Sequence, residues 1–213
     1  VHSHYSLLDG LAKIEDLVPR AKELGFEALA LTDHGSMHGI PEFYKKATAA
    51  GLKPILGLEA YLATESRFQK RSQIDAKRYH ITLLAKNNIG YKNLLQINTK
   101  AHLEGFYYKP RLDWELLEQH HEGLVAMSAC IKGHVPYLLL SDRPEEARQV
   151  AMRYQALFND DYYLEVQNHG LPEELKVNPL LAELGKELNI PLVATQDAHY
   201  PCRSDAYAHD LLL

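Results

Sequence analysis

The chain has 213 residues, a formal net charge of −5, 46% hydrophobic and 24% charged residues, which is typical of a globular domain that buries a core. This charge argues against a strongly basic nucleic-acid coat, and no apolar run is long enough to cross a bilayer. Two cysteines exclude a disulfide framework, and without a signal-peptide pattern we expect a cytoplasmic protein. The unusual component is histidine, with 12 residues.

Short apolar runs alternate with amphipathic segments along nearly the whole chain. The runs predict strands at 27–34, 53–62, 81–86, 123–129, 161–167 and 191–196. Helical spacing predicts helices at 14–24 and 41–50, each followed by a glycine, and around Leu94, Ala147 and Leu181. The polar and basic segment 63–78 is expected to be an exposed loop, including Lys70, Arg71 and Arg78.

Alternating strands and helices with short loops predict a parallel sheet covered by helices. With about seven strands and no glycine-rich dinucleotide motif, we expect a closed or nearly closed barrel. Val1 begins directly in a motif, and AYAHDLLL at 206–213 resembles an unfinished helix. We therefore expect one domain, 1–213, cut at both ends from a longer protein.

The opening VHSHYSLLDG places His2 and His4 two residues apart and Asp9 five residues further on. On a strand, residues i and i+2 point the same way, so both imidazoles would project from one face. They would supply two of the ligands that a divalent metal needs. For these two histidines alone, a solvated or core pair is an equally good interpretation, so the rest of the chain decides.

In parallel α/β folds, functional side chains gather at the carboxyl ends of the strands. Metal-competent side chains follow one apolar run after another: Asp33 and His34, Glu59, Cys130, Glu165 and His169, and Asp197 with His199. His80 is the exception, because it opens its run. Either its strand runs in a different direction or the side chain reaches in from an unusual position.

Nine side chains could bind metal: His2, His4, Asp9, His34, Glu59, His80, Cys130, Asp197 and His199. They are too many for one tetrahedral zinc and enough for two or three divalent ions, if a carboxylate bridges. Zinc, manganese and iron all suit this donor set. Spacing alone indicates a multi-metal hydrolase.

Several motifs resemble those of the PHP (polymerase and histidinol phosphatase) superfamily: HxH with a following Asp, TDH, GLEAYL, RYHITLLAKN, SACIKG and DAHY. Longer stretches, such as GFYYKPRLD, YYLEVQNHG and LVATQDAHY, are similar to the amino-terminal PHP domain of bacterial DNA polymerase III alpha subunits. The resemblance spans essentially the whole chain. It implies a distorted (β/α)7 TIM-like barrel holding three metals at the carboxyl ends of the strands.

The resemblance also implies a role for each candidate residue. His2, His4, Glu59 and Asp197 would hold the first ion, Glu59 would bridge to a second at His80 and Cys130, and Asp9, His34 and His199 would hold the third. Asp33 could orient a ligand histidine. His169 and Arg203 adjoin motif residues and could contact phosphate. Cys130 alone would be read as a small buried hydrophobe, so its metal role depends on the resemblance.

The implied function is metal-dependent hydrolysis of phosphodiesters by activated water, as a 3′–5′ proofreading exonuclease acting on the 3′ end of a primer strand. The implied partners are DNA, the remainder of a polymerase chain and a separate proofreading subunit. One alternative is a non-catalytic, metal-stabilised scaffold that supports the polymerase and docks its proofreading subunit. Another is a free-standing phosphatase of the histidinol phosphate type. An amidohydrolase is remote, because no lysine stands at a convincing strand end for a bridging carbamate.

Overall fold

The computed structural model describes residues 1–212. The strands are β1 Ala28–Leu31, β2 Lys53–Ala63, β3 Arg78–Ala85, β4 Arg111–Leu112, β5 Leu124–Met127, β6 Tyr162–Val166 and β7 Leu192–Ala194. The helices are α1 Ile14–Glu23, α2 Ile40–Ala49, α3 Asn88–Leu103, α4 Trp114–His120, α5 His134–Leu140, α6 Pro144–Phe158, α7 Pro172–Leu188 and α8 Ala206–Leu212, with 3-10 turns η1 Asn159–Asp161 and η2 Arg203–Asp205. Within 1–212, no helix has the length and apolarity to cross a membrane.

The sheet is mixed and not wholly parallel. Its strand order is β1-β2-β3-β5-β6-β7, with β4 beside β2. Among the strands of residues 1–212, only β3 runs antiparallel to its neighbours, β2 and β5. The prediction of an all-parallel sheet is therefore wrong at β3, and the alternative that the strand of His80 runs in a different direction is confirmed. The physical reason is that no helix separates β2 from β3, and a parallel neighbour would need such a crossover.

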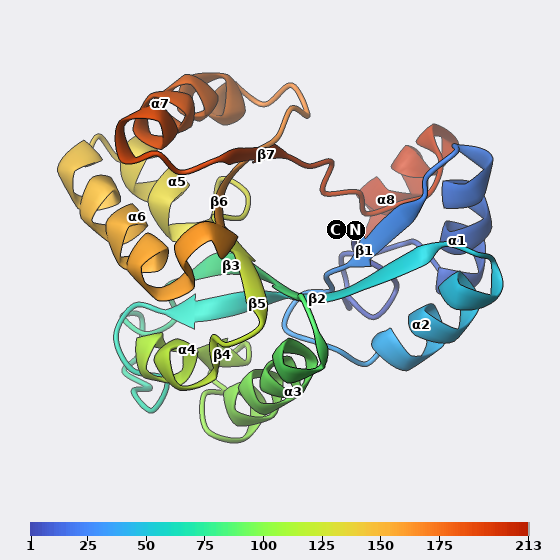
Figure 1. Cartoon of the computed structure of the whole chain (residues 1–213), viewed down its shortest axis with the longest axis horizontal. Helices are drawn as coiled ribbons and strands as arrows, with labels where there is room; N and C mark the ends of the chain where they lie inside the picture. The colour runs from blue at the N-terminus through green and yellow to red at the C-terminus, as the bar shows by residue number, and fades with distance from the viewer. Residues whose placement is uncertain (213) are drawn as a thin grey trace.

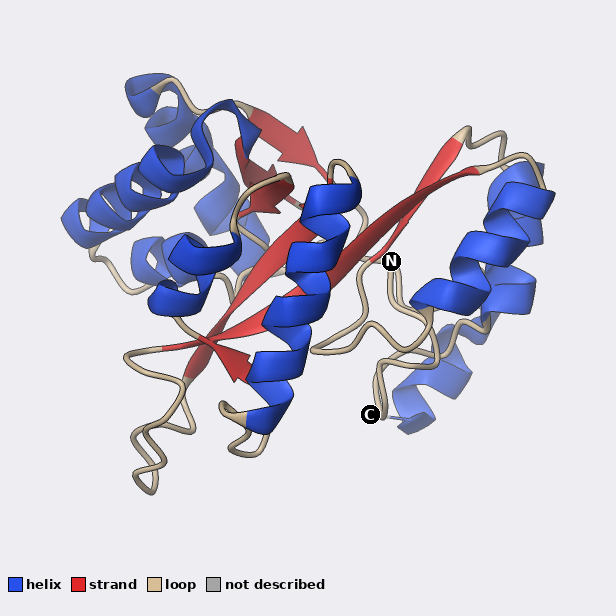
Figure 2. Cartoon of the chain, turned by 60° about the horizontal axis from the view of Figure 1, so that its bottom comes forward, coloured by secondary structure: helices blue, strands red, loops and turns tan. Residues whose placement is uncertain are grey.

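The sheet curls from β1 round to β7, with helices along its outside (Figure 1; Figure 2). In the described chain, no ladder joins β7 to β1. The amino-terminal residues bridge that gap instead: Thr32 N donates to the Val1 carbonyl over 3.0 Å, and His2 N donates to the Ala198 carbonyl over 2.9 Å. The fold is thus a curled α/β half-barrel, and the closed (β/α)7 barrel is not confirmed.

Helices cover the sheet with the apolar faces that the sequence periodicity predicts. In α1, the buried side chains are Ile14, Leu17, Val18 and Ala21, at helical spacing. They join one continuous core that includes the strand residues Leu31, Leu58 and Leu83. Burial of this common face fixes the helices against the outside of the curl and leaves its inner edge for polar side chains.

The segment 64–77 between β2 and β3 is only partly the exposed loop that was predicted. The side chain of Arg67 is buried and donates to Asp113 over 2.8 Å. The Arg111 side chain, from a residue 1% exposed, donates to four backbone carbonyls, those of Arg67, Gln69, Asp75 and Gly105. Two buried guanidinium groups therefore hold this segment against the sheet.

Candidate metal centre

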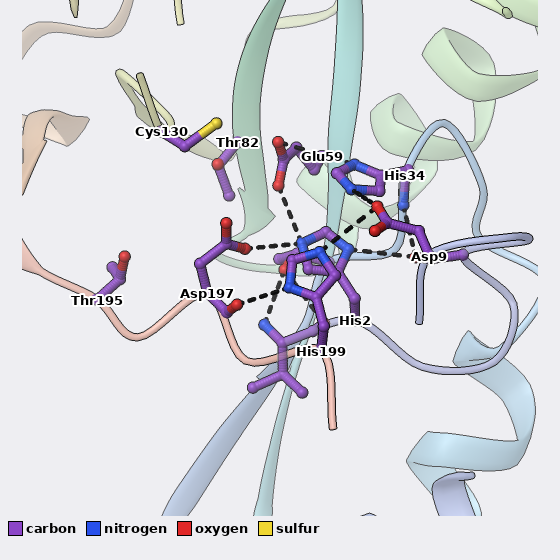
Figure 3. A network of polar contacts seen from close by, with 12 residues as sticks. His2, Asp9, His34, Glu59, Thr82, Cys130, Thr195, Asp197 and His199 are labelled. Carbon is purple, nitrogen blue, oxygen red and sulfur yellow. Dashed lines mark hydrogen bonds and ion pairs between the residues drawn. The ribbon is translucent and has the colours of Figure 1, made fainter. Parts of the chain in front are cut away.

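A cluster of histidines and carboxylates lies at the inner edge of the curl (Figure 3). His2 is fully buried at its centre, with Nε2 2.9 Å from Asp197 Oδ1 and 3.0 Å from Glu59 Oε2. These residues come from the amino-terminal segment, from β2 and from the segment after β7. Side chains far apart in the sequence therefore converge on one place, as the metal-site prediction requires.

Glu59 contacts histidines with both of its oxygens. Oε1 lies 2.5 Å from His80 Nδ1 and 3.7 Å from His34 Nδ1, while Oε2 faces His2. On the antiparallel pair β2–β3, Glu59 lies opposite Thr82, which makes His80 its diagonal neighbour on the same face. The reversed direction of β3 thus explains how a residue that opens its strand reaches the cluster. Glu59 has the position that a bridging carboxylate needs.

A third part of the cluster is built around Asp9. Its Oδ2 lies 2.6 Å from His34 Nε2 and 3.5 Å from His199 Nε2. His199 Nδ1 donates to the Asp197 carbonyl over 2.7 Å, which leaves Nε2 as the atom with a free lone pair. The His2 ring stacks with those of both His34 and His199, with centroids 4.1 Å and 4.3 Å away.

The donor atoms form three groups whose members lie within 4.8 Å of one another: His2, His34 and His199; His34, Glu59 and His80; and His2, Glu59 and Asp197. One buried atom in the cluster, His34 Nδ1, has no hydrogen-bond partner. A buried polar atom without a partner is costly in a folded protein, and a cation would satisfy it. Imidazole nitrogens and carboxylate oxygens are ligands of zinc, manganese and iron. The residues therefore fit divalent cations.

The electrostatics of the cluster favour a positive charge at its centre. Burial alone would lower the pKa of His2, but the Asp197 and Glu59 carboxylates outweigh it and raise that pKa to about 9. Burial alone would raise the pKa of Glu59, but His2 and His80 hold it well below its usual range. A proton on His2 therefore neutralises the carboxylates when no cation does. Metal binding here would displace that proton and weaken as the pH falls.

His4 does not join the cluster. It is exposed, and its ring packs beside Tyr5 with the centroids 4.3 Å apart. The prediction that His2 and His4 share a strand face is wrong, because the backbone turns at His4 and only Ser3 forms a bridge, with Ala12. The rule that i and i+2 point the same way holds only for extended backbone.

Cys130 lies at the margin of the cluster, with Sγ 3.8 Å from His80 Nδ1. Burial raises the pKa of its thiol, so without a cation the sulfur stays protonated. Cys130 follows β5, as predicted, and Figure 3 shows it on the side of Glu59 away from Asp9. The structure therefore keeps Cys130 within reach of the cluster but outside the three groups of converging donors.

Asp33 organises the amino-terminal turn and does not contact the ring of its neighbour His34. It accepts hydrogen bonds from Ser3 N over 2.6 Å, from Ser3 Oγ over 2.8 Å and from Ser6 Oγ over 2.8 Å. Since the Ser6 hydroxyl donates to Asp33, its oxygen accepts from His2 Nδ1, 3.2 Å away. His2 Nε2 then faces the carboxylates as the ligand atom. The sequence analysis missed Ser6, which no metal-ligand pattern includes.

Beside the cluster lies a cavity of about 780 Å³, whose lining includes Asp9, His34 and His80. Neither of the predicted phosphate contacts lines it. His169 is held by Glu174 and by the Gln196 carbonyl, and Arg203 is exposed on η2. The cavity wall carries four other cations instead, Lys77, Arg78, Lys109 and Lys132. The sequence analysis assigned Arg78 to a solvated loop and gave the other three no role in phosphate binding.

Curated proteins that are similar to this chain include DNA polymerase III alpha subunits of several bacteria. DNA polymerase III subunit alpha of Treponema pallidum is 54% identical over 215 residues, covering 100% of this chain and 18% of the relative. The same subunit of Thermus aquaticus is 48% identical over 216 residues, with the same coverage, and that of Borreliella burgdorferi is 47% identical over 214 residues, covering 100% and 19%. The chain thus spans about a fifth of the length of these relatives.

Two solved structures share the fold. A two-domain protein containing a predicted PHP-like metal-dependent phosphoesterase, from Bacteroides vulgatus, superposes with a TM-score of 0.57 at 17% identity, covering 96% of this chain and 52% of that one. An amidohydrolase from Chromobacterium violaceum, with bound sulfate and no metal, gives a TM-score of 0.57 at 14% identity, covering 99% and 94%. The PHP domain family matches residues 1–169, as the motifs predicted. The chain belongs to the PHP family.

Proposed function

We propose that this chain is the metal-dependent phosphoesterase domain of a DNA polymerase III alpha subunit and hydrolyses phosphodiesters at the 3′ end of a DNA strand. One observation carries the proposal. His2, His34 and Glu59 each belong to two of the three groups of candidate metal-ligand atoms, and the cluster borders a cavity with cations on its wall. The names of the curated relatives supply the polymerase context. In that context the activity would be a 3′–5′ proofreading exonuclease.

Divalent cations at this cluster would supply Lewis-acid polarisation of phosphate oxygens and activation of water at neutral pH. The residues of the chain would do the positioning. Glu59 has one oxygen directed to His2 and the other to His80, so it can hold two cations close together. His2 and His199 each have Nδ1 engaged by a protein oxygen, which directs their Nε2 atoms into the cluster. Preorganised ligands of this kind need no rearrangement during the reaction.

A second function has an observation in its favour. The cluster joins the amino-terminal segment, through His2, to the segment after β7, through Asp197, at the gap where the sheet does not close. Cations there would stabilise the half-barrel even without catalysis. This supports a metal-stabilised scaffold for the rest of the polymerase chain and for a separate proofreading subunit.

The two functions are separated by an experiment on the full-length protein. It is stripped with a chelator and reloaded with Mn²⁺ or Zn²⁺, and cleavage of a single-stranded oligonucleotide and of a mismatched primer end is followed. Phosphoesterase function predicts that the reloaded metal restores cleavage and that Asp197→Asn abolishes it. Asp161→Asn, at a carboxylate paired with Lys86 away from the cluster, is the matched control. A metal-loaded, fully folded protein without cleavage would leave the scaffold as the function.

A further inference from the structure

Four cations on the cavity wall have no acidic partner in the part of the chain that the structure describes. They are Lys77 and Arg78 at the start of β3, Lys109 before β4, and Lys132 in the loop after β5. Some other cations of this acidic chain pair with carboxylates, among them Lys46 and Lys86, so what distinguishes the four is their position together on one cavity wall. Unpaired positive charge gathered on one concave surface attracts a polyanion.

The aromatic ring of Tyr61 connects two of these cations, Arg78 and Lys109, to the metal-ligand cluster. The Arg78 guanidinium lies 5.2 Å from its centroid and the Lys109 ammonium lies 5.8 Å from it. The same ring lies near His34, stacked at 6.1 Å, and near His80, edge-on at 5.2 Å. Tyr61 is 6% exposed, so its packed ring lies beside both two of the cations and two of the candidate ligands.

The backbone fixes the distance between cations and cluster. Arg78 lies two positions before His80 on β3, so their Cα atoms lie about 7 Å apart along the strand. The segment that leads into Lys77 is held by Arg111, which donates to the carbonyls of Gln69 and Asp75. Lys77 itself donates to the Tyr137 hydroxyl over 2.8 Å. Lys77 and Arg78 are therefore held at a set distance from the site where a phosphate would react.

We propose that Lys77, Arg78, Lys109 and Lys132 bind backbone phosphates of a single DNA strand, next to the phosphate that lies at the metal cluster. This inference rests on the proposed function and specifies its substrate as a chain of several nucleotides, not a small phosphate ester. The cavity volume is that of pockets for single small ligands, which fits the end of one strand and not a duplex.

The first test is independent of catalysis. Lysines of the full-length protein are acetylated with a water-soluble reagent in the presence of EDTA, with and without a (dT)8 oligonucleotide, and the modified positions are quantified by mass spectrometry. We expect several-fold protection of Lys109 and Lys132, reduced by added salt, and none of the exposed Lys92 and Lys186. Thymidine 5′-monophosphate at the same phosphate concentration should protect little. Equal protection by the mononucleotide, or none by the oligonucleotide, overturns the inference.

The second test uses the metal-loaded protein with two substrates, (dT)8 and bis(p-nitrophenyl) phosphate. For Lys109→Ala/Lys132→Ala, we expect kcat/KM for the oligonucleotide to fall at least tenfold more than kcat/KM for the small diester. The matched control Lys92→Ala/Lys186→Ala should leave both unchanged. Equal losses on the two substrates overturn the inference. Lys109→Gln/Lys132→Gln, which removes the charge but keeps a long polar side chain, should repeat the alanine result. If wild type cleaves neither substrate, the proposed function fails, while the acetylation result still decides the inference.

Discussion

Replacing Asp33 should damage both the fold and the metal site. The residue is 1% exposed and accepts three hydrogen bonds from Ser3 and Ser6. A hydrogen bond to a charged group contributes about 1.5–3 kcal/mol, but three bonds in one network do not add fully. For Asp33→Ala we therefore expect a loss of about 3–5 kcal/mol in the free energy of unfolding. Since Ser6 orients His2, we also expect metal affinity to fall about 10–100-fold.

Asp113 offers a matched control for this prediction. It is 3% exposed and also accepts three hydrogen bonds, from Arg67 N, Arg67 Nη1 and Leu116 N, but none of these partners touches the metal cluster. Asp33→Ala and Asp113→Ala would be compared by urea unfolding of the stripped protein and by competition with a coloured chelator for Zn²⁺. We expect both variants to lose stability and only Asp33→Ala to lose affinity. Equal Zn²⁺ affinities in the two variants would refute the idea that Asp33 orients His2 through Ser6.

Three further predictions follow from individual side chains. Arg111→Met should cost about 3 kcal/mol and make the segment 64–77 the first site of limited proteolysis, because it removes donors to four backbone carbonyls. His134 stacks on Tyr79, and burial lowers its pKa to about 4. The unfolded chain therefore binds the proton more readily than the folded chain does. The free energy of unfolding, measured by urea titration, should fall by up to about 3 kcal/mol as the pH drops from 6.5 to 4. The fall should be smaller in His134→Phe. His4→Ala should leave the metal content unchanged in elemental analysis, since His4 is exposed outside the cluster.

The sequence predicts most regular elements because hydrophobic periodicity reports burial directly. The strand predicted at 53–62 is observed as β2 at Lys53–Ala63, and the helix predicted at 14–24 is α1 at Ile14–Glu23. The elements that were missed are short. The two residues of β4 are too few for any period to be seen, and α4 and α5 have seven residues each.

The direction of β3 could have been predicted from the chain, because no helical pattern occurs between residues 63 and 78. That direction brings both His80 and the cations before it to the edge where the other strands end. The orientation of His4 could not be predicted in this way. It depends on the turn that Ser3 and Ser6 form around Asp33, about 30 residues away in sequence, and local patterns do not report such contacts.

The position of the cluster links metal binding to closure of the sheet. His2 and Asp197 contact each other from the two segments that meet at the gap between β1 and β7. A ligand that binds only the folded state stabilises it by about 2.7 kcal/mol at a concentration 100 times its Kd. Local openings that separate these segments would also break the site, so amide exchange at residues 1–12 and 195–202 should slow most on metal addition. Under conditions in which exchange proceeds through local openings, amides of β2 and β3, which are paired on both sides, should change less. Uniform slowing of amide exchange across the sheet, or no slowing at residues 1–12 and 195–202, would show that cations do not join the two ends of the sheet.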